Sequence, residues 1–139
     1  MGWRSLFMPY EASWLVEGRI VMIVGSGNLS KTDIDRMDAD MLAYLEDSDA
    51  ERVHFIFDAS GMVKLPGLSV MSEMRAPKHP AMGWNIVAGD LNRLTRFLVA
   101  TVARFNRVRF RTFDSVDEAI DFLWNADTTL PESKPGPFV

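Results

Sequence analysis

The stretch Arg19-Ile-Val-Met-Ile-Val24 decides the fold class of this 139-residue chain. It is nearly all apolar, which is typical of a central strand that is buried on both faces of a sheet. A second β run, Ser13-Trp-Leu-Val16, precedes it, and Glu17-Gly18 between the two runs predicts a tight hairpin, because glycine readily adopts turn dihedrals. Gly25-Ser-Gly27 then interrupts the apolar run. The sequence therefore predicts an antiparallel hairpin whose second strand lies inside a sheet.

Beyond residue 30, helical and extended patterns alternate along the chain. Further strands are expected at 53–57, 84–88 and 107–113, and helices from about 30 to at least 46 and at about 66–75, 91–106 and 115–125. Strands that alternate with helices indicate a largely parallel sheet covered by helices. The predicted fold is an α/β domain with a mixed, largely parallel five-stranded sheet, an N-terminal antiparallel hairpin and four helices.

The first expected helix begins at about Ser30 or Thr32, since both residues are good N-caps. Apolar residues recur in it at helical spacing, which predicts one side that faces the core. This apolar set comprises Ile34, Met37, Met41, Leu42 and Leu45. Asp38 falls outside the set, so we place it on the other side of the helix.

Length and composition predict a single domain. We assign residues 1–11 to an N-terminal extension, 12–125 to the folded domain and 126–139 to a flexible C-terminal tail, because Thr, Pro, Ser, Lys and Gly dominate that tail. The chain has no cysteine, which excludes disulfides and thiolate chemistry and fits a reducing compartment. No apolar run reaches the roughly 20 residues of a membrane span, and the start of the chain does not look like a secretory signal. We therefore expect a cytoplasmic protein.

The formal net charge of −4 is unevenly distributed. Residues 1–61 carry 5 basic and 11 acidic groups, and residues 112–139 carry 1 basic and 6 acidic groups. Residues 62–111, in contrast, carry 9 basic and 2 acidic groups. An acidic whole argues against nucleic-acid binding. The basic middle third either presents a local positive face or is neutralised by the acidic segments across the fold.

Several short motifs carry a resemblance to a known family. They are the strand end Phe57-Asp58-Ala59-Ser60-Gly61, the Lys78-His79-Pro80 loop before Trp84, and the terminal helix that opens with Ser115-Val-Asp-Glu-Ala119. Together with the order of elements, they resemble the small SpoIIAA-like, or STAS-type, domains over about residues 12–124. The uncharacterised branch of that family, whose fold is shared with CRAL-TRIO lipid-binding proteins, is the nearer match.

The resemblance implies a regulatory role for the serine in this motif. In the anti-sigma factor antagonists of the family, the second serine of an Asp-Ser-Ser-Gly type segment is phosphorylated by a partner kinase. Ser60 would be that serine, Asp58 its acidic neighbour and Gly61 the glycine. Alternatively, Asp58 and Ser60 only organise a turn through side-chain to backbone hydrogen bonds.

The two histidines do not predict a metal or catalytic centre. His54 falls inside an expected strand, whereas Lys78 and His79 lie in an expected loop that is a candidate contact site. A metal site needs three or four convergent ligands, and no pair of residues here has a familiar ligand spacing. A Ser60–His79–Asp triad lacks the Gly-x-Ser-x-Gly elbow of the hydrolases. We predict no catalytic residues, no metal and no cofactor.

Two further features suggest possible ligands. Arg107, Arg109 and Arg111 alternate with apolar residues in the last expected strand, so they either contact an anion such as a phosphate or lipid headgroup, or protect a sheet edge from pairing with another molecule. Met37, Met41, Met71 and Met74 fall on inner helical faces. Methionine there is ordinary core filling or the lining of a site for an apolar ligand.

The sequence as a whole favours a non-catalytic regulatory module that binds another protein, such as a kinase or signalling regulator, with a possible phosphorylation site at Ser60. The alternative is a carrier or sensor of a small apolar or amphipathic, lipid-like ligand, and an enzyme of unknown type ranks third. The resemblance implies a bacterial protein, and a homodimer is compatible with the pattern.

Overall fold

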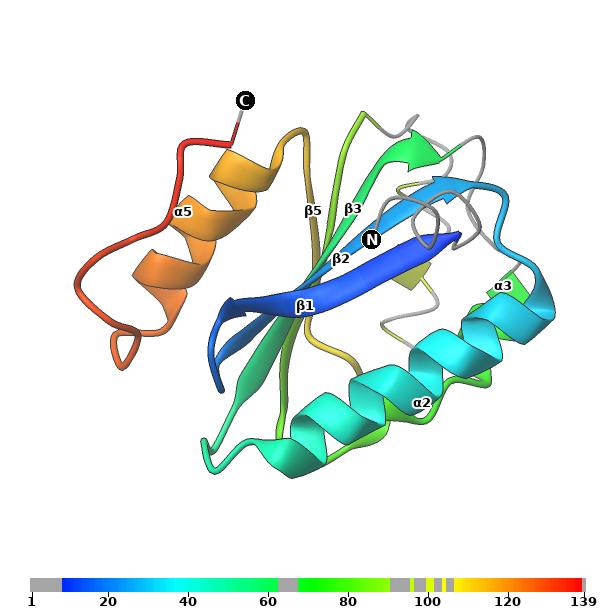
Figure 1. The fold of residues 1–139 in the computed structure, drawn as a ribbon, viewed down its shortest axis with the longest axis horizontal. Coiled ribbons are helices and arrows are strands. Elements are labelled where there is room, and N and C mark those ends of the chain that lie inside the picture. The colour runs from blue at the N-terminus through cyan, green and yellow to red at the C-terminus, as the bar shows by residue number, and fades with distance from the viewer. Residues whose placement is uncertain are drawn as a thin grey trace.

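The alternating pattern of the sequence folds into one five-stranded sheet with helices on both faces (Figure 1). The computed structural model describes residues 9–62, 68–90 and 107–138, together with 96, 100, 101 and 104. The strands are β1 (Tyr10–Val16), β2 (Ile20–Gly27), β3 (Val53–Met62), β4 (Met82–Ala88) and β5 (Phe110–Phe113). They lie in the spatial order β1-β2-β3-β4-β5. β1 pairs with β2 antiparallel and the other neighbours pair parallel, which confirms the predicted mixed sheet.

The described helices are α2 (Lys31–Asp47), α3 (Leu68–Ser72), the short 3₁₀ helix η1 (Ala76–Lys78) and α5 (Val116–Ala126). In Figure 1, α2 and α3 lie on one side of the sheet and α5 lies on the other. Serine caps fix two of the helix starts. Ser30 and Asp33 form a reciprocal capping box at α2, and Ser115 accepts a hydrogen bond from the Glu118 amide at α5.

Three α-helices are defined in the described part of the chain, against four expected. The expected helix over 91–106 falls mainly outside the described residues, although residues 96, 100, 101 and 104 are helical. None of the described helices has the length and apolarity needed to cross a membrane.

Each face of the sheet has its own hydrophobic core. Between the sheet and α2, the core includes Val21, Met37, Met41 and Phe55. Between the sheet and α5, it includes Ile20, Ile56, Ile86, Ile120 and Leu123. β2 contributes to both cores, as the apolar run that opened the sequence analysis predicted.

Asp38 departs from its expected place on the outer side of α2, since it is only 6% exposed. Its carboxylate accepts hydrogen bonds from the backbone N–H groups of Arg75 and Ala76, at 2.7 to 3.0 Å. Those amides start η1 and need acceptors, because a buried N–H without a partner is costly. This contact also lies where the second helix was expected to continue to residue 75, whereas α3 ends at Ser72.

Most strands are longer than predicted: β1 begins at Tyr10 rather than Ser13, β2 ends at Gly27 rather than Val24, and β4 begins at Met82 rather than Trp84. β3 continues through Met62, because Ser26 and Gly27 of β2 still pair with Gly61 and Met62. β5 begins only at Phe110, and Arg107 before it has a positive φ of 56°, which an extended strand does not allow. The expected strand over 107–113 is therefore correct only for its second half.

The segment that follows α5 was expected to be a flexible tail from residue 126. Leu130 packs into the core beneath α5 and is 8% exposed. Trp124 donates its indole N–H to the carbonyl of Pro131, and the Phe138 amide donates to Asp117. The chain thus folds back along the outside of its last helix (Figure 1).

Candidate functional site

The carboxyl ends of β2, β3 and β4 meet at one edge of the sheet. Asp58 of β3 is in register with Val24 of β2 and with Ala88 of β4. In open sheets of parallel strands, this edge is where ligands and partners usually bind, because the chain leaves the strands there in exposed loops. We call it the carboxyl edge and define it by Val24, Asp58, Ser60, Gly61 and Gly89.

Ser60 is exposed on the carboxyl edge and is held by Asp58. The Ser60 hydroxyl donates to Asp58 Oδ1 at 2.7 Å, and the Ser60 amide donates to the same oxygen at 3.0 Å. The expected hydrogen bonding between these two residues is therefore present, although they lie in a strand rather than in a turn. The hydroxyl remains at the surface, next to a carboxylate.

Among the described residues, the backbone of neighbouring segments approaches Ser60 and Gly61 closely. Gly89 has a φ of +136°, and a Cβ built on it would lie 3.1 Å from the Ser60 nitrogen. A Cβ on Gly61 would lie 3.1 Å from the Gly25 carbonyl oxygen. Val24, beside Asp58, is 44% exposed, which is unusual for an apolar residue in an inner strand of this sheet. An exposed apolar side chain and an exposed hydroxyl thus lie on the same edge of the sheet.

Lys78 and His79 lie at the opposite edge of the sheet. β4 begins at Met82, just after His79, and Met82 is aligned with Val53 at the start of β3. His79 Nδ1 accepts a hydrogen bond from the Ala81 amide at 3.0 Å, so this histidine organises its own loop. Ser60 and His79 therefore do not form the catalytic arrangement that was considered from the sequence.

The three arginines before and within β5 have different surroundings. Arg107 is exposed in a turn, and Arg111 lies over the Phe122 ring of α5, 4.8 Å from its centre. Arg109 points to the amino edge of the sheet, where it lines a cavity. The structure does not bring the three guanidinium groups together in one row, since β5 starts after the first two.

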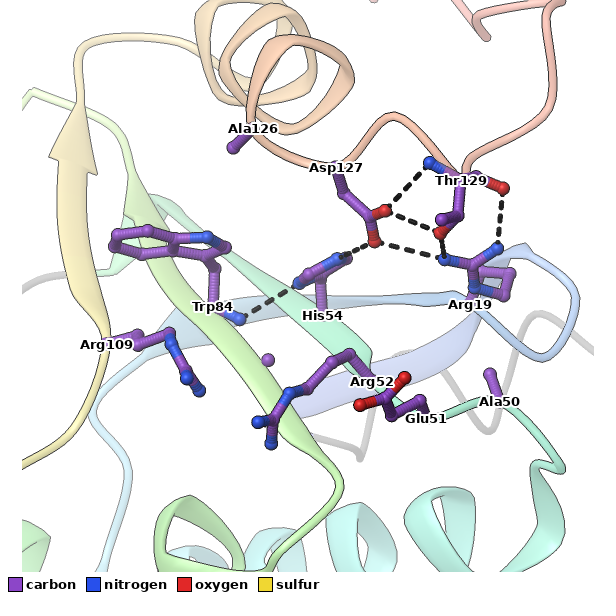
Figure 2. A pocket seen from close by; sticks show the side chains of 11 residues that line it. Arg19, Ala50, Glu51, Arg52, His54, Trp84, Arg109, Ala126, Asp127 and Thr129 are labelled. Atoms are coloured by element: carbon purple, nitrogen blue, oxygen red, sulfur yellow. Dashed lines mark hydrogen bonds and ion pairs between the residues drawn. The ribbon is translucent and has the colours of Figure 1, made fainter.

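The amino edge of the sheet carries the most connected polar network among the described residues (Figure 2). His54 is 3% exposed and accepts the Trp84 amide proton on Nδ1 at 2.9 Å. Its Nε2 lies 2.8 Å from Asp127 Oδ2. Since Nδ1 accepts, the ring is neutral with its proton on Nε2, which donates to Asp127.

Asp127 is the centre of this network. Arg19 donates to Asp127 Oδ2 at 3.0 Å, and the Thr129 hydroxyl and amide both donate to Oδ1. Burial acts to raise the pKa of Asp127, but the hydrogen bonds from Thr129 and His54 outweigh it and lower the pKa to about 2. Burial also lowers the pKa of His54, against the opposing effect of Asp127. The pair is therefore a neutral imidazole beside a carboxylate.

A cavity of about 500 Å³ opens beside this network. Its lining comes from residues just before or at the start of the strands and from the end of α5 with the residues that follow it. It comprises Arg19, Ala50, Glu51, Arg52, His54, Gly83, Trp84, Arg109, Ala126, Asp127 and Thr129. A volume of this size is within the range of small-molecule sites. Among the described residues, no group of three or more His, Asp or Glu side chains is placed to hold a metal ion.

Comparisons with known proteins identify the fold. No protein-family model matches the chain, and no curated protein is similar to it in sequence. An uncharacterised protein of the DUF3478 family with a SpoIIAA-like fold, from Shewanella loihica PV-4, superimposes with a TM-score of 0.61 at 13% identity, over 82% of this chain and 91% of that one. The chain has the SpoIIAA-like fold.

The anti-sigma factor antagonist SpoIIAA itself, in its unphosphorylated form, superimposes with a TM-score of 0.56 at 14% identity. The match covers 84% of this chain and 96% of SpoIIAA. The resemblance found in the sequence is thereby confirmed at the level of the fold, over nearly the whole length of both solved structures.

Sequence reasoning missed the cavity of this SpoIIAA-like domain, although a signal for it was present. Arg19, Arg52 and Arg109 directly precede β2, β3 and β5. The amino ends of parallel strands meet at one edge, so arginines at those positions are brought together. Asp127 and Thr129 had no such signal, because they fall in a segment that composition marks as a tail.

Proposed function

We propose that this SpoIIAA-like domain is a non-catalytic regulatory module that binds another protein through its carboxyl edge, and that phosphorylation of Ser60 controls the binding. The observation that carries the proposal is the exposed apolar Val24 beside the hydrogen-bonded pair of Ser60 and Asp58. Protein contacts are typically centred on apolar side chains with polar groups around them. The likeness to an anti-sigma factor antagonist that has an unphosphorylated form supports the same reading.

The geometry suggests how phosphorylation would act. The Ser60 hydroxyl now donates its proton to Asp58, and a phosphoserine has no such proton to donate. A phosphate would add about −1.5 to −2 charges at neutral pH next to the Asp58 carboxylate. Repulsion would move the modified side chain out over the surface beside Val24, where it would have to be desolvated in a complex.

The partner of this type of surface is a kinase or another signalling regulator that contacts Val24 and needs the space beside it to be free of a phosphate. A carrier of apolar ligands is less well supported, because Met37 and Met41 of α2, which would line such a site, are 3% and 5% exposed and packed in the core between α2 and the sheet. A cytoplasmic location agrees with a regulatory partner of this kind.

Binding to the partner recovered from the source organism tests the proposal. Ser60→Ala should bind as the unmodified protein does, whereas Ser60→Asp should bind about tenfold or more weakly, because it places a second carboxylate beside Asp58. Ser133→Asp is the matched control, since Ser133 is exposed in the segment after α5. Equal binding by Ser60→Asp and Ser60→Ala would show that Ser60 is no switch.

A further inference from the structure

The cavity at the amino edge is separate from the surface proposed to bind a protein. Ser60 at the carboxyl edge lies six residues along β3 from His54 in the cavity lining, a distance of about 20 Å at the usual rise of a strand. The cavity therefore plays no part in the proposed protein binding at the carboxyl edge.

Charge is the first feature of the lining. It contains three guanidinium groups and two carboxylates, those of Glu51 and Asp127. Arg19 is the ion-pair partner of Asp127 at 3.0 Å. Within the described part of the chain, Arg52 and Arg109 form no ion pair with any carboxylate, and Glu51 has none with a cation. Arg52 and Arg109 thus have no ion-pair partner among the described residues, and the five charged side chains of the lining sum to +1.

Arg52 and Arg109 are nevertheless held in place. Arg52 Nη1 donates to the Pro80 carbonyl at 2.5 Å, and Arg109 Nη1 lies 3.5 Å from the Met82 carbonyl. Each of these contacts occupies one N–H of a group that has five. Both side chains extend to the cavity from either side of β4 in Figure 2. Neither guanidinium group makes a further hydrogen bond within the described part of the chain, so its other N–H groups can bind a ligand.

The floor of the cavity is rigid. His54 is held at both ring nitrogens, and a Cβ on Gly83 would lie 2.3 Å from His54 Nδ1, so the backbone of β4 approaches the ring as closely as only glycine allows. The Trp84 indole also lines the cavity and is braced by the Phe122 ring, 4.9 Å away between centres. A preformed floor with an aromatic side chain is typical of a small-molecule site.

We infer that this cavity binds a small organic anion, whose oxyanion group lies between Arg52 and Arg109 and whose apolar or planar body lies against Trp84. The oxyanion is a phosphate monoester or a carboxylate, because the planar guanidinium group matches both in a two-point contact. The cavity volume of about 500 Å³ is sufficient for a ligand of this size.

Titration of the ¹⁵N-labelled protein with two probes, phenyl phosphate and phenylacetate, tests the inference, with benzyl alcohol as the neutral control. We expect saturable shifts of the Gly83 and Trp84 amide signals with one or both anions, and affinity that falls with added salt. The double variant Arg52→Gln/Arg109→Gln should bind about tenfold or more weakly. Arg36→Gln, a matched loss of one exposed charge on α2, should bind as the unmodified protein does.

The outcome also identifies the ligand class. Saturation by phenyl phosphate alone supports a phosphate ester, saturation by phenylacetate alone supports a carboxylate, and saturation by both supports recognition of the shared oxyanion. No saturation by either anion at millimolar concentration, an equal response to benzyl alcohol, or full affinity in the double variant would overturn the inference. The amide signals away from the cavity report whether the double variant is folded. If it is not, the single variant Arg109→Gln, at an exposed side chain, decides the matter in the same way.

Discussion

His54 Nε2 lies 2.8 Å from Asp127 Oδ2, and this contact ties the start of β3 to the residue that caps the end of α5, 73 residues further along the chain. Arg19, before β2, and Thr129 meet the same carboxylate. One acidic side chain thus connects the sheet to α5 and to the segment that follows it. The first three predictions concern this connection.

Asp127→Ala should lower the free energy of unfolding by about 3 kcal/mol, because it leaves the buried His54 N–H without its acceptor and removes the ion pair of Arg19, which keeps only its hydrogen bonds to Thr129. Urea denaturation measures the change. Asp121→Ala is the matched control, since its partner Lys134 is an exposed side chain, and it should cost about 0–1 kcal/mol. Equal effects of the two variants would mean that the network contributes no more than a surface ion pair.

Stability should fall in acid in a way that depends on Asp127. The pKa of its carboxyl is lowered from 3.8 to about 2 in the folded protein, so the unfolded chain binds the proton more readily. The contribution of Asp127 is therefore fully present above about pH 4 and is lost as the pH falls towards 2, at about 1–2 kcal/mol after allowance for its partial exposure. Asp127→Asn should show a flatter dependence in this window, and a slope identical to that of the unmodified protein would contradict the assignment.

The imidazole of His54 should stay neutral below the usual pKa of histidine, with its proton on Nε2. Burial lowers the pKa of His54. Protonation of Nδ1 would also replace the hydrogen bond from the Trp84 amide with a repulsive contact between two N–H groups. Long-range ¹H–¹⁵N spectra of the two histidines distinguish the tautomers, with His79 as the internal comparison. An imidazolium signal for His54 at about pH 6, near the usual histidine pKa, would be incompatible with the hydrogen bond from Trp84.

Gly83→Ala should destabilise the protein by about 2 kcal/mol or more, because the new Cβ would lie 2.3 Å from His54 Nδ1 and the ring cannot move without losing both of its bonds. Gly18→Ala gives the matched comparison. Gly18 has a φ of +75°, but the nearest atom to its Cβ is 3.8 Å away, so only backbone strain of about 1 kcal/mol is expected. Thermal unfolding of both variants should show the larger loss at Gly83, and the reverse order would show that His54 is free to shift.

The SpoIIAA-like architecture could be predicted from local patterns. The apolar run of β2, the Glu17-Gly18 turn and the serine caps at Ser30 and Ser115 each act within a few residues, so the sequence displays them directly. Where the prediction differed, a distant partner was responsible. Asp58 to Gly61 look like a turn because they are small and polar, yet pairing with Ser26 and Gly27 keeps them extended.

Of the two candidate sites, one could be predicted from local sequence and the other could not. Ser60 could be found from its motif, because the motif is continuous in sequence. The cavity could not, since its lining comes from five separate segments and its central carboxylate from a stretch whose composition resembles a disordered tail. The burial of Asp38 could not be predicted either. Helical periodicity places Asp38 on the solvent side of α2, but its carboxylate is buried against two backbone amides that lie 37 and 38 residues further along the chain.

Site-specific crosslinking tests the regulatory proposal most directly. When the protein carries a photoreactive amino acid in place of Val24 and is expressed in the source organism, it should form a crosslinked adduct with another protein. Adding Ser60→Asp to the same chain should abolish this adduct. The same group at Ala43, which is exposed on α2, should give no such adduct. Adducts of the same protein at both positions, or an adduct at Val24 that persists with Ser60→Asp, would contradict a partner surface controlled by Ser60.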